Sequence, residues 1–350
     1  MTMSGAFNTA LSGLAASARG AAVVSENVSN ALTEGYGKRR LQLSPSTTGG
    51  GVQVTGIARR VDPQLIGERR DAGAAAVAAE TRVAFLEGIE RAIGLPGEPG
   101  SLGTRLAGLE SSLIDAASRP DAPARLQAVA QAAADLARGL NDVSREIQDQ
   151  RMEADRAITA AVEDLNGRLR EIGGLNARIA HLEAGRQDAS GLIDRRRNAI
   201  DAVAELVPVR EIRRENGRVA LFSREGAILL DSRPAEIAFT RSGPITAAMT
   251  AESGALSGLQ LGDRPIDTGG GGPLSGGRLA ALFAIRDDSA PALQARLDAV
   301  ARDLADRLGD PATDPTLGPA DAGVLTDAGA RPTAAALIST GVPSARFASC

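Results

Sequence analysis

The chain begins MTMSGAFNTALSGLAASARGAAVVSENVSNALTEGYGKRR, residues 1–40. Its apolar and small residues recur at alternating steps of four and three, the spacing of a heptad seam on one side of a helix. The seam consists of Phe7, Leu11, Leu14, Ala18, Ala21, Ser25, Val28 and Leu32. Because a helix this thin and interrupted by several glycines has little stability of its own, we expect it to pack against helices of this chain or of neighbouring copies.

A polar cluster and a glycine turn follow the seam, and glycine allows the chain to turn there with positive φ. ALSGLAASARGAAVVSENVSNALTEGYGKRR, residues 10–40, resembles the N-terminus shared by bacterial flagellar rod, hook and hook-associated proteins. In that family an S-x-N-aliphatic-S-N element ends the helix and a T-x-G-aromatic turn follows. The matching residues are Leu11 to Leu14, Ser25, Asn27, Val28, Ser29, Asn30, Thr33, Gly35 and Tyr36, whereas Leu32 departs from the family pattern.

Composition limits the classes of function. The 350 residues are 43% hydrophobic but only 2% aromatic, which suits close helix packing, and the net charge of −4 gives no basic excess for nucleic acid. Cys350 and His181 are the only residues of their types, so we expect no disulfide framework or metal site and a solvated His181. No apolar run is long enough to span a membrane, and the N-terminus lacks the pattern of a cleaved signal peptide.

The first half predicts a mainly α-helical fold. Residues 38–43 and 51–60 read as short strands, and helices are expected at 63–93 and 101–118. A long helix at about 124–183 follows, with Gly173-Gly174 as an expected kink. Its spacing alone is equally typical of a generic coiled coil.

GLIDRRRNAIDAVAELVPV, residues 191–209, resembles the segment of the hook-associated protein 1 family in which a short helix leads into a β-domain. Asp194, Arg195 and Asp201 keep their places in the family pattern, and Arg197 replaces a residue that is usually acidic. We interpret the Asp–Arg pair as a helix cap that fixes this domain handover. A catalytic Asp194 would need a partner and a pocket, and the sequence indicates neither.

A small antiparallel β region is expected next. Asn216-Gly217 is a strong hairpin signal between strands at 209–215 and 218–223. Further strands are predicted at 227–230, 235–239, 245–249 and 256–261. Gly269 to Gly272 lack the following lysine and the flanking strand and helix of a phosphate loop, so we interpret them as a linker.

A last helix is expected from 276 to about 308, and GGRLAALFAIRD resembles the family segment that returns to the helical domain. The predicted organisation is therefore 1–60 (axial element), 61–207 (helical), 208–275 (β-rich), 276–309 (return helix) and 310–350 (tail). The family ends in a helix that pairs with the N-terminal one. Residues 331–350 show no such heptad, so that helix is expected to be missing.

The resemblance implies a structural subunit at the junction between flagellar hook and filament. It implies contacts with other copies, the hook protein, the second junction protein, the export apparatus and its chaperone, without cofactor or membrane. It also implies an extracellular location, reached without cleavage of a signal. The alternatives are another axial protein of the rod or hook and a cytoplasmic coiled-coil scaffold. An enzyme is disfavoured because the acidic residues are spread along helix surfaces.

Overall fold

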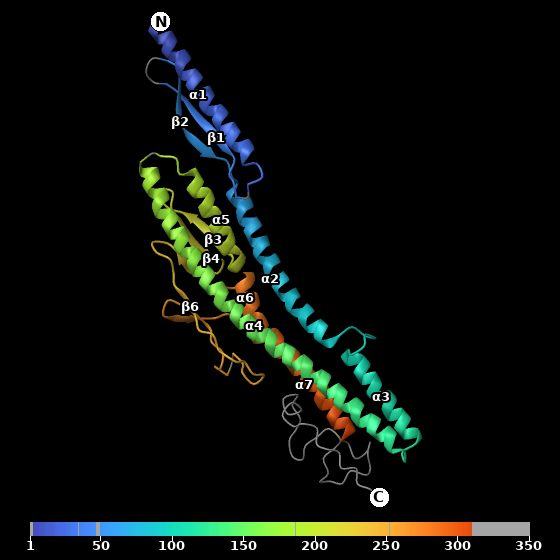
Figure 1. Ribbon diagram of the computed structural model, residues 1–350. Helices are drawn as coiled ribbons and strands as arrows, with labels where there is room; N and C mark the ends of the chain where they lie inside the picture. The colour runs from blue at the N-terminus through green and yellow to red at the C-terminus, as the bar shows by residue number, and fades with distance from the viewer. Residues whose placement is uncertain (1–2, 34, 47–49, 186, 252, 310–350) are drawn as a thin grey trace. The chain divides into compact units, whose positions relative to one another are not determined.

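The computed structural model describes residues 3–33, 35–46, 50–185, 187–251 and 253–309 (Figure 1). The helices are α1 Met3–Ser29, α2 Pro63–Ile93, α3 Leu102–Ser118, α4 Pro123–Ala184, α5 Ser190–Leu206, α6 Gly277–Ala284 and α7 Ala290–Leu308, with a π-helical turn, η1, at Ile285–Ser289. The strands are β1 Arg39–Pro45, β2 Val52–Arg59, β3 Val209–Arg213, β4 Val219–Ser223, β5 Ile228–Leu230, β6 Ile237–Phe239, β7 Leu259–Leu261 and β8 Arg264–Ile266. The fold is mainly α with small antiparallel sheets, as the sequence predicted.

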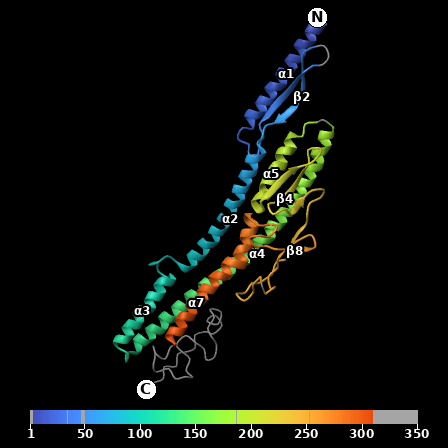
Figure 2. The same ribbon diagram turned by 180° about the vertical axis from the view of Figure 1, so that it is seen from behind.

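The described residues form two compact units. The first contains those of 1–77, 161–238 and 260–279, and the second contains those of 78–160, 239–259 and 280–350. In the first unit, α1 lies along a hairpin of β1 and β2 (Figures 1 and 2). The two strands pair antiparallel from Arg39 opposite Arg59 to Pro45 opposite Val52, with an irregularity after Gln42.

The core of the first unit lies between the C-terminal part of α4, the helix α5 and the sheet β3-β4-β5. Asn216 and Gly217 have φ of 53° and 66°, so the predicted hairpin turn between β3 and β4 is confirmed. Buried Asn176 of α4 holds this hairpin, because its Nδ2 donates to the Val219 carbonyl at 2.8 Å and its Oδ1 accepts from the Val219 N–H at 3.2 Å. The largest buried aliphatic side chains here are Leu165, Leu169, Ile172, Ile179, Ile200, Leu221 and Leu229.

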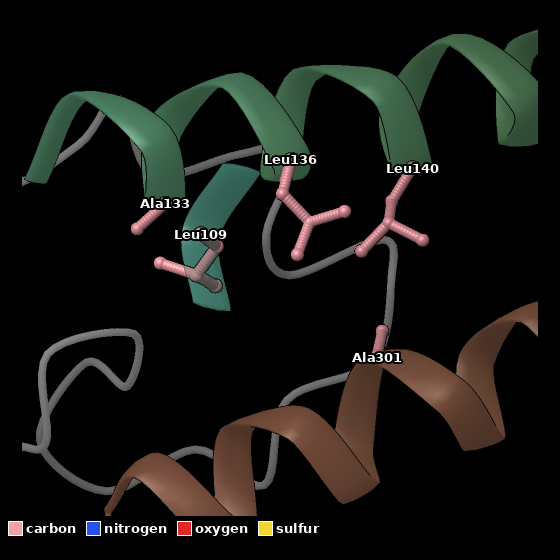
Figure 3. Close-up of a cluster of buried hydrophobic side chains, with 5 residues drawn as sticks. All are labelled: Leu109, Ala133, Leu136, Leu140 and Ala301. Atoms are coloured by element: carbon pink, nitrogen blue, oxygen red, sulfur yellow. The ribbon is translucent and has the colours of Figure 1, made fainter. Parts of the chain in front are cut away.

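In the second unit, α3, the N-terminal part of α4 and α7 share a core. Figure 3 shows Leu136 and Leu140 of α4 pointing toward Leu109 of α3 and Ala301 of α7, with Ala133 beside them. Each of these five side chains is at most 5% exposed. Alanine at 133 and 301 lets the helix backbones approach closely, in line with the close packing expected from the hydrophobic but aromatic-poor composition.

The expected last helix contains a π-helical turn between α6 and α7. The N–H of Ala290 donates to the carbonyl of Ile285, five residues back. With the same spacing, the carbonyl of Arg286 would accept from the N–H of residue 291. That residue is Pro291, which has no N–H. Arg151 of α4 takes its place, because its Nε donates to the Arg286 carbonyl at 3.0 Å.

The predicted strand at 245–249 is wrong, and Arg151 supplies the reason. Its guanidinium donates to the carbonyls of Thr246, at 3.0 Å, and Met249, at 2.6 Å, so these groups are used by a side chain instead of a neighbouring strand. Strand β8 was not predicted, and it pairs with β7 in the sheet β6-β7-β8. The kink expected at Gly173 and Gly174 does not interrupt α4, which continues through both residues.

Two further expectations, the division into domains and the nature of the tail, are not tested by the described residues. The division into five sequence domains stays a prediction, and the tail at 310–350, on which the expectation about the C-terminal helix rests, lies outside the described residues. His181 is exposed on α4, as expected. Among the helices in the described part of the chain, none is long and apolar enough to cross a membrane.

Candidate functional site

Helix α1 has one covered face and one exposed face. Ala16 and Val23 are buried against the β1–β2 hairpin, and Gly20 and Asn27 are half-buried on the same side. From Phe7 to Val28 the predicted seam lies on the opposite side, about half a turn away at 3.6 residues per turn, whereas Leu32 lies in the turn beyond the end of α1 at Ser29. Its large side chains are exposed in the single chain: Phe7 by 70%, Leu11 by 55%, Leu14 by 69%, Val28 by 71% and Leu32 by 101%. Ala18, Ala21 and Ser25 are exposed as well.

Sequence reasoning predicted the seam but missed the covered face. That face follows a second stripe, Ser12, Ala16, Gly20, Val23 and Asn27, with the same steps of three and four. Its residues are mostly small, and the hairpin can therefore approach the helix closely. Ser12 adds a polar contact at this face, since its Oγ accepts from the Val52 N–H at 3.2 Å.

The polar motif after the seam joins the helix to the hairpin. Asn27 donates from Nδ2 to the Arg39 carbonyl at 2.9 Å, and its Oδ1 accepts from the Arg39 N–H at 2.8 Å and the Tyr36 hydroxyl at 3.0 Å. Asn30 donates to the Glu26 carbonyl and accepts from the Thr33 hydroxyl at 3.2 Å. Of the predicted motif residues, the structure thus brings together Asn27 with Tyr36, and Asn30 with Thr33. Ser25 and Ser29 lie exposed on α1.

Asp194 of α5 binds the turn that follows this motif. Its carboxylate accepts from the Gly37 N–H at 3.3 Å and pairs with Arg59 at 2.7 Å and Arg39 at 3.4 Å. Gly35 allows this close approach: its φ is 76°, and a Cβ there would lie 1.6 Å from Asn198 Oδ1 of α5. The expectation that Asp194 caps its helix is wrong, because α5 begins at Ser190, and the Ser190 N–H donates to Asp188 instead, at 2.9 Å.

Asp201 lies two turns further along α5 and binds the start of α2. It forms ion pairs with Arg69 and with Arg70, whose Nε donates at 2.6 Å. Arg70 is 6% exposed and also pairs with Glu211 of β3 at 2.9 Å. Arg195, the third predicted handover residue, instead forms an exposed pair with Glu171 of α4. We name the contacts of Asp194 and Asp201 the ionic joint.

Burial and neighbouring charge shift the pKa values of several groups at the joint. Burial lowers the pKa of Arg39, but the hydrogen bond to Glu26 and the nearby Tyr36 and Asp194 outweigh it, so the pKa is raised. Burial and the adjacent Arg59 lower the pKa of Arg197, whose buried Nε has no hydrogen-bond partner in the described structure. Arg197, one of the residues at which the chain departs from the family pattern, thus adds a positive charge that the attraction of Asp201 offsets only in part.

The comparisons with known proteins agree with this architecture. Residues 86–311 match the family described as "Flagellar hook-associated protein FlgK helical domain". The chain belongs to this family. The matched stretch includes α3, α4 and α5, and therefore both carboxylates of the ionic joint.

Curated relatives of this FlgK-family chain extend the match. It is 25% identical over 285 residues to flagellar hook-associated protein 1 of Salmonella typhimurium, covering 78% of this chain and 51% of that protein. It is 23% identical over 280 residues to the Escherichia coli K12 protein of the same name, covering 76% and 51%. The chain thus spans about half the length of the curated relatives it matches.

A solved structure supports the fold. The flagellar hook junction protein FlgK from Burkholderia pseudomallei is similar over 70% of this chain and 43% of that one, with a TM-score of 0.56. The two sequences are 19% identical over this match, so the similarity establishes the common fold alone.

Proposed function

We propose that this FlgK-family chain is a structural, non-enzymatic subunit of the bacterial flagellum that acts at the junction between hook and filament. In this proposal the seam of α1 is its contact with neighbouring copies. One observation carries the proposal: α1 covers its own hairpin with one face and leaves an apolar seam exposed on the opposite face. The family and the names of its relatives support the place of action.

Covering the seam would contribute a substantial favourable free energy to association between copies. Burying one large apolar side chain contributes about 1.5–3 kcal/mol, and Phe7, Leu11, Leu14, Val28 and Leu32 can each be covered. If the seam of one copy is covered by a different surface of the next copy, the contact is heterologous. Heterologous contacts build rings or open helical assemblies. An axial tube is an assembly of this kind.

The ionic joint has a supporting role in this proposal. Asp194 and Asp201 hold the N-terminal turn and the start of α2 against α5, so the seam is presented from a fixed base. The β-rich segment of 208–275 would then lie on the outer surface of the tube. Both carboxylates are paired with arginines, which fits a positioning role better than proton transfer.

The proposed partners follow from the same place of action. They are other copies of the chain, the hook protein and the second junction protein, with the export apparatus and its chaperone before assembly. The proposed location is extracellular, after export without cleavage of a signal peptide. We propose no nucleic-acid or membrane partner and no cofactor.

Substitution of Leu14 by Asp tests the seam. Because Leu14 is 69% exposed in the single chain, Leu14→Asp should leave the fold of α1 and of the β segments intact. It places a charge in the middle of a contact that must exclude water, so incorporation into flagella should be lost. Asn8→Asp, at an exposed residue of α1 outside the seam, is the matched control and should assemble normally.

The measurements are the chain content of purified flagella and the motility of cells that carry each variant as their only copy. Circular dichroism of the purified variants confirms folding. Normal incorporation of Leu14→Asp would show that the seam is not the contact. Retention of the unaltered chain in the cytoplasm would instead support the scaffold alternative, and its presence only in rods or hooks would support another axial role.

A further inference from the structure

The first unit contains a basic cleft that the seam and the ionic joint do not explain. A cavity of about 550 Å³ opens between the start of α2, the helix α5 and the hairpin β3–β4. Seven arginines and three carboxylates line it, in a chain whose net charge is −4. The arginines are Arg59, Arg196, Arg210, Arg213, Arg214, Arg218 and Arg224. We name this cavity the basic cleft.

Only some of this positive charge is compensated. Arg59, Arg214 and Arg224 pair with Asp194, Asp231 and Asp71, in that order. The ion pairs of the described chain include none from the four other arginines of the cleft, Arg196, Arg210, Arg213 and Arg218. The cleft therefore carries an excess of positive charge that an anionic group from outside can neutralise.

Arg196 shows that the cleft is a built site. Its side chain is 6% exposed, and its Nη1 donates to Asn176 Oδ1 at 2.8 Å and to the Gly217 carbonyl at 2.7 Å. These two contacts fix the guanidinium at the cleft wall. Burial lowers the pKa of Arg196, against the attraction of Glu211 and Glu183. A guanidinium held in place, desolvated and without an ion pair favours binding of an additional carboxylate.

The rest of the lining indicates a protein partner. Glu183, Glu211 and Asp71 lie among the arginines and would repel the dense charge of a polyanion. Val61, Pro63, Ile66, Ile193, Val209 and Val219 give the cleft an apolar part. Apolar surface with arginine around it is typical of a protein interface, where separated carboxylates can each find an arginine.

A complementary surface exists on the chain itself. Glu87, Glu90 and Glu98 surround a shallow hollow in the second unit, in which Arg91 is the single basic residue. All three glutamates are exposed, and Glu98 Oε2 is fixed by the Leu95 N–H at 3.0 Å. We name these three glutamates the acidic patch. Because cleft and patch are different surfaces, their contact between copies is heterologous and repeats along an assembly.

We propose that the basic cleft binds the acidic patch of a second copy of this chain. This inference rests on the proposed self-assembly and assigns it a second, electrostatic contact separate from the seam. The contact adds register, because the position of the paired charges fixes where one copy lies along the next.

Charge exchange between cleft and patch tests the inference. All chains carry Leu14→Asp, so that the seam does not contribute, and the chain with this substitution alone is the parent. Self-association is measured by sedimentation at low ionic strength. The cleft variant carries Arg213→Glu and Arg218→Glu, and the patch variant carries Glu87→Arg and Glu90→Arg. Each variant alone should associate at least ~10-fold more weakly than the parent, because like charges then face each other.

An equimolar mixture of the two variants restores opposite charges at both kinds of contact, so association should return to the level of the parent. The control variant Arg170→Glu with Arg178→Glu makes the same change in net charge on exposed residues of α4 and should associate like the parent. No self-association of the parent, or no recovery in the mixture, would overturn the inference. Neither result affects the seam, which is tested separately by incorporation of Leu14→Asp into flagella.

Discussion

Asn27 makes three hydrogen bonds with one side chain: two hold Arg39 at the start of the hairpin to α1, and one holds Tyr36 of the preceding turn. Asn27→Asp keeps the shape but replaces the donor Nδ2 by an oxygen that faces the Arg39 carbonyl. Leaving a partly buried carbonyl without its donor costs about 1–3 kcal/mol. We therefore expect the amides of β1 and β2 to exchange at least ~10-fold faster, measured by hydrogen exchange and mass spectrometry.

Asn30→Asp is the control in the same motif. Among the described residues, the Asn30 side chain bonds only within its own turn, to the Glu26 carbonyl and the Thr33 hydroxyl, through exposed hydrogen bonds. Its substitution should change hairpin exchange by less than about 0.5 kcal/mol in free energy. Equal effects of the two substitutions would show that Asn27 does not fix the hairpin.

Asp288 gives a prediction of pH dependence. Burial and the neighbouring Asp287 raise its pKa above the ordinary value of 3.8, so its charged form is disfavoured in the folded chain. A raised carboxyl pKa gives stability that is complete below the unfolded pKa and is lost as pH rises through the folded pKa. Asp288→Asn should therefore stabilise the chain at pH 7 by less than about 1 kcal/mol, because Asp288 is partly exposed.

The measurement for Asp288 is the urea midpoint of the two proteins across pH. The advantage of the Asn variant should shrink as pH is lowered from 7 toward 3.8, where the aspartate is protonated in the folded state. Asp303→Asn on the exposed face of α7 is a control, since it removes a carboxylate from an exposed ion pair with Arg307. An advantage at Asp288 that is independent of pH would exclude the electrostatic explanation.

At the level of elements, α4 contains adjacent glycines with different surroundings. A Cβ on Gly174 would meet no atom within 4 Å, whereas a Cβ on Gly173 would lie 3.4 Å from Pro234 Cγ. Gly174→Ala should stabilise the chain by about 1 kcal/mol through helix propensity alone. Gly173→Ala should gain less than half of that, and Gly173→Leu should destabilise by about 1–3 kcal/mol through overpacking against Pro234.

Thermal unfolding of the three glycine variants provides the measurement. If Gly173→Leu were as stable as the parent, the loop that contains Pro234 would not be held against α4. The expected kink stays a prediction, since α4 continues through both glycines without a break in its helical assignment. Gly173 allows the loop that contains Pro234 to pack closely on the helix, whereas a Cβ on Gly174 would meet open space.

Helices and the tight hairpin could be predicted because their signals are local. The long apolar periodicity predicted α4, whose observed bounds are Pro123–Ala184. Asn216-Gly217 predicted the hairpin between β3 and β4, because these residues adopt the positive φ values that its turn needs. The strand at 245–249 failed because its carbonyls bind Arg151, about a hundred residues away in sequence. The partners of Asp194 were equally invisible, since Arg39 and Gly37 reach it only through the folded turn.

At the scale of the whole molecule, two proposed contacts of opposite chemistry share one chain. The seam is apolar, with large side chains exposed on α1, whereas the basic cleft carries arginines without ion pairs in the described structure. The seam is presented by the first unit alone, as is the cleft, while the acidic patch belongs to the second unit. A copy would therefore present its two units to different neighbours, which a repeating assembly requires.

The two contacts should respond to salt in opposite directions. Raising salt from about 0.01 M to 1 M shortens the Debye length from about 30 Å to about 3 Å, which screens the contact of cleft and patch. Sulfate strengthens apolar burial, so it should favour the seam while it screens the cleft. Light scattering of the unaltered chain should therefore fall on addition of sodium chloride and recover as sodium sulfate is raised further.

The cleft variant with an intact seam should show only the rise in light scattering, and Leu14→Asp should show only the fall. A fall without recovery in the unaltered chain would show that the seam contributes nothing to assembly in solution, and an identical response of both variants would show that the two contacts are not separable.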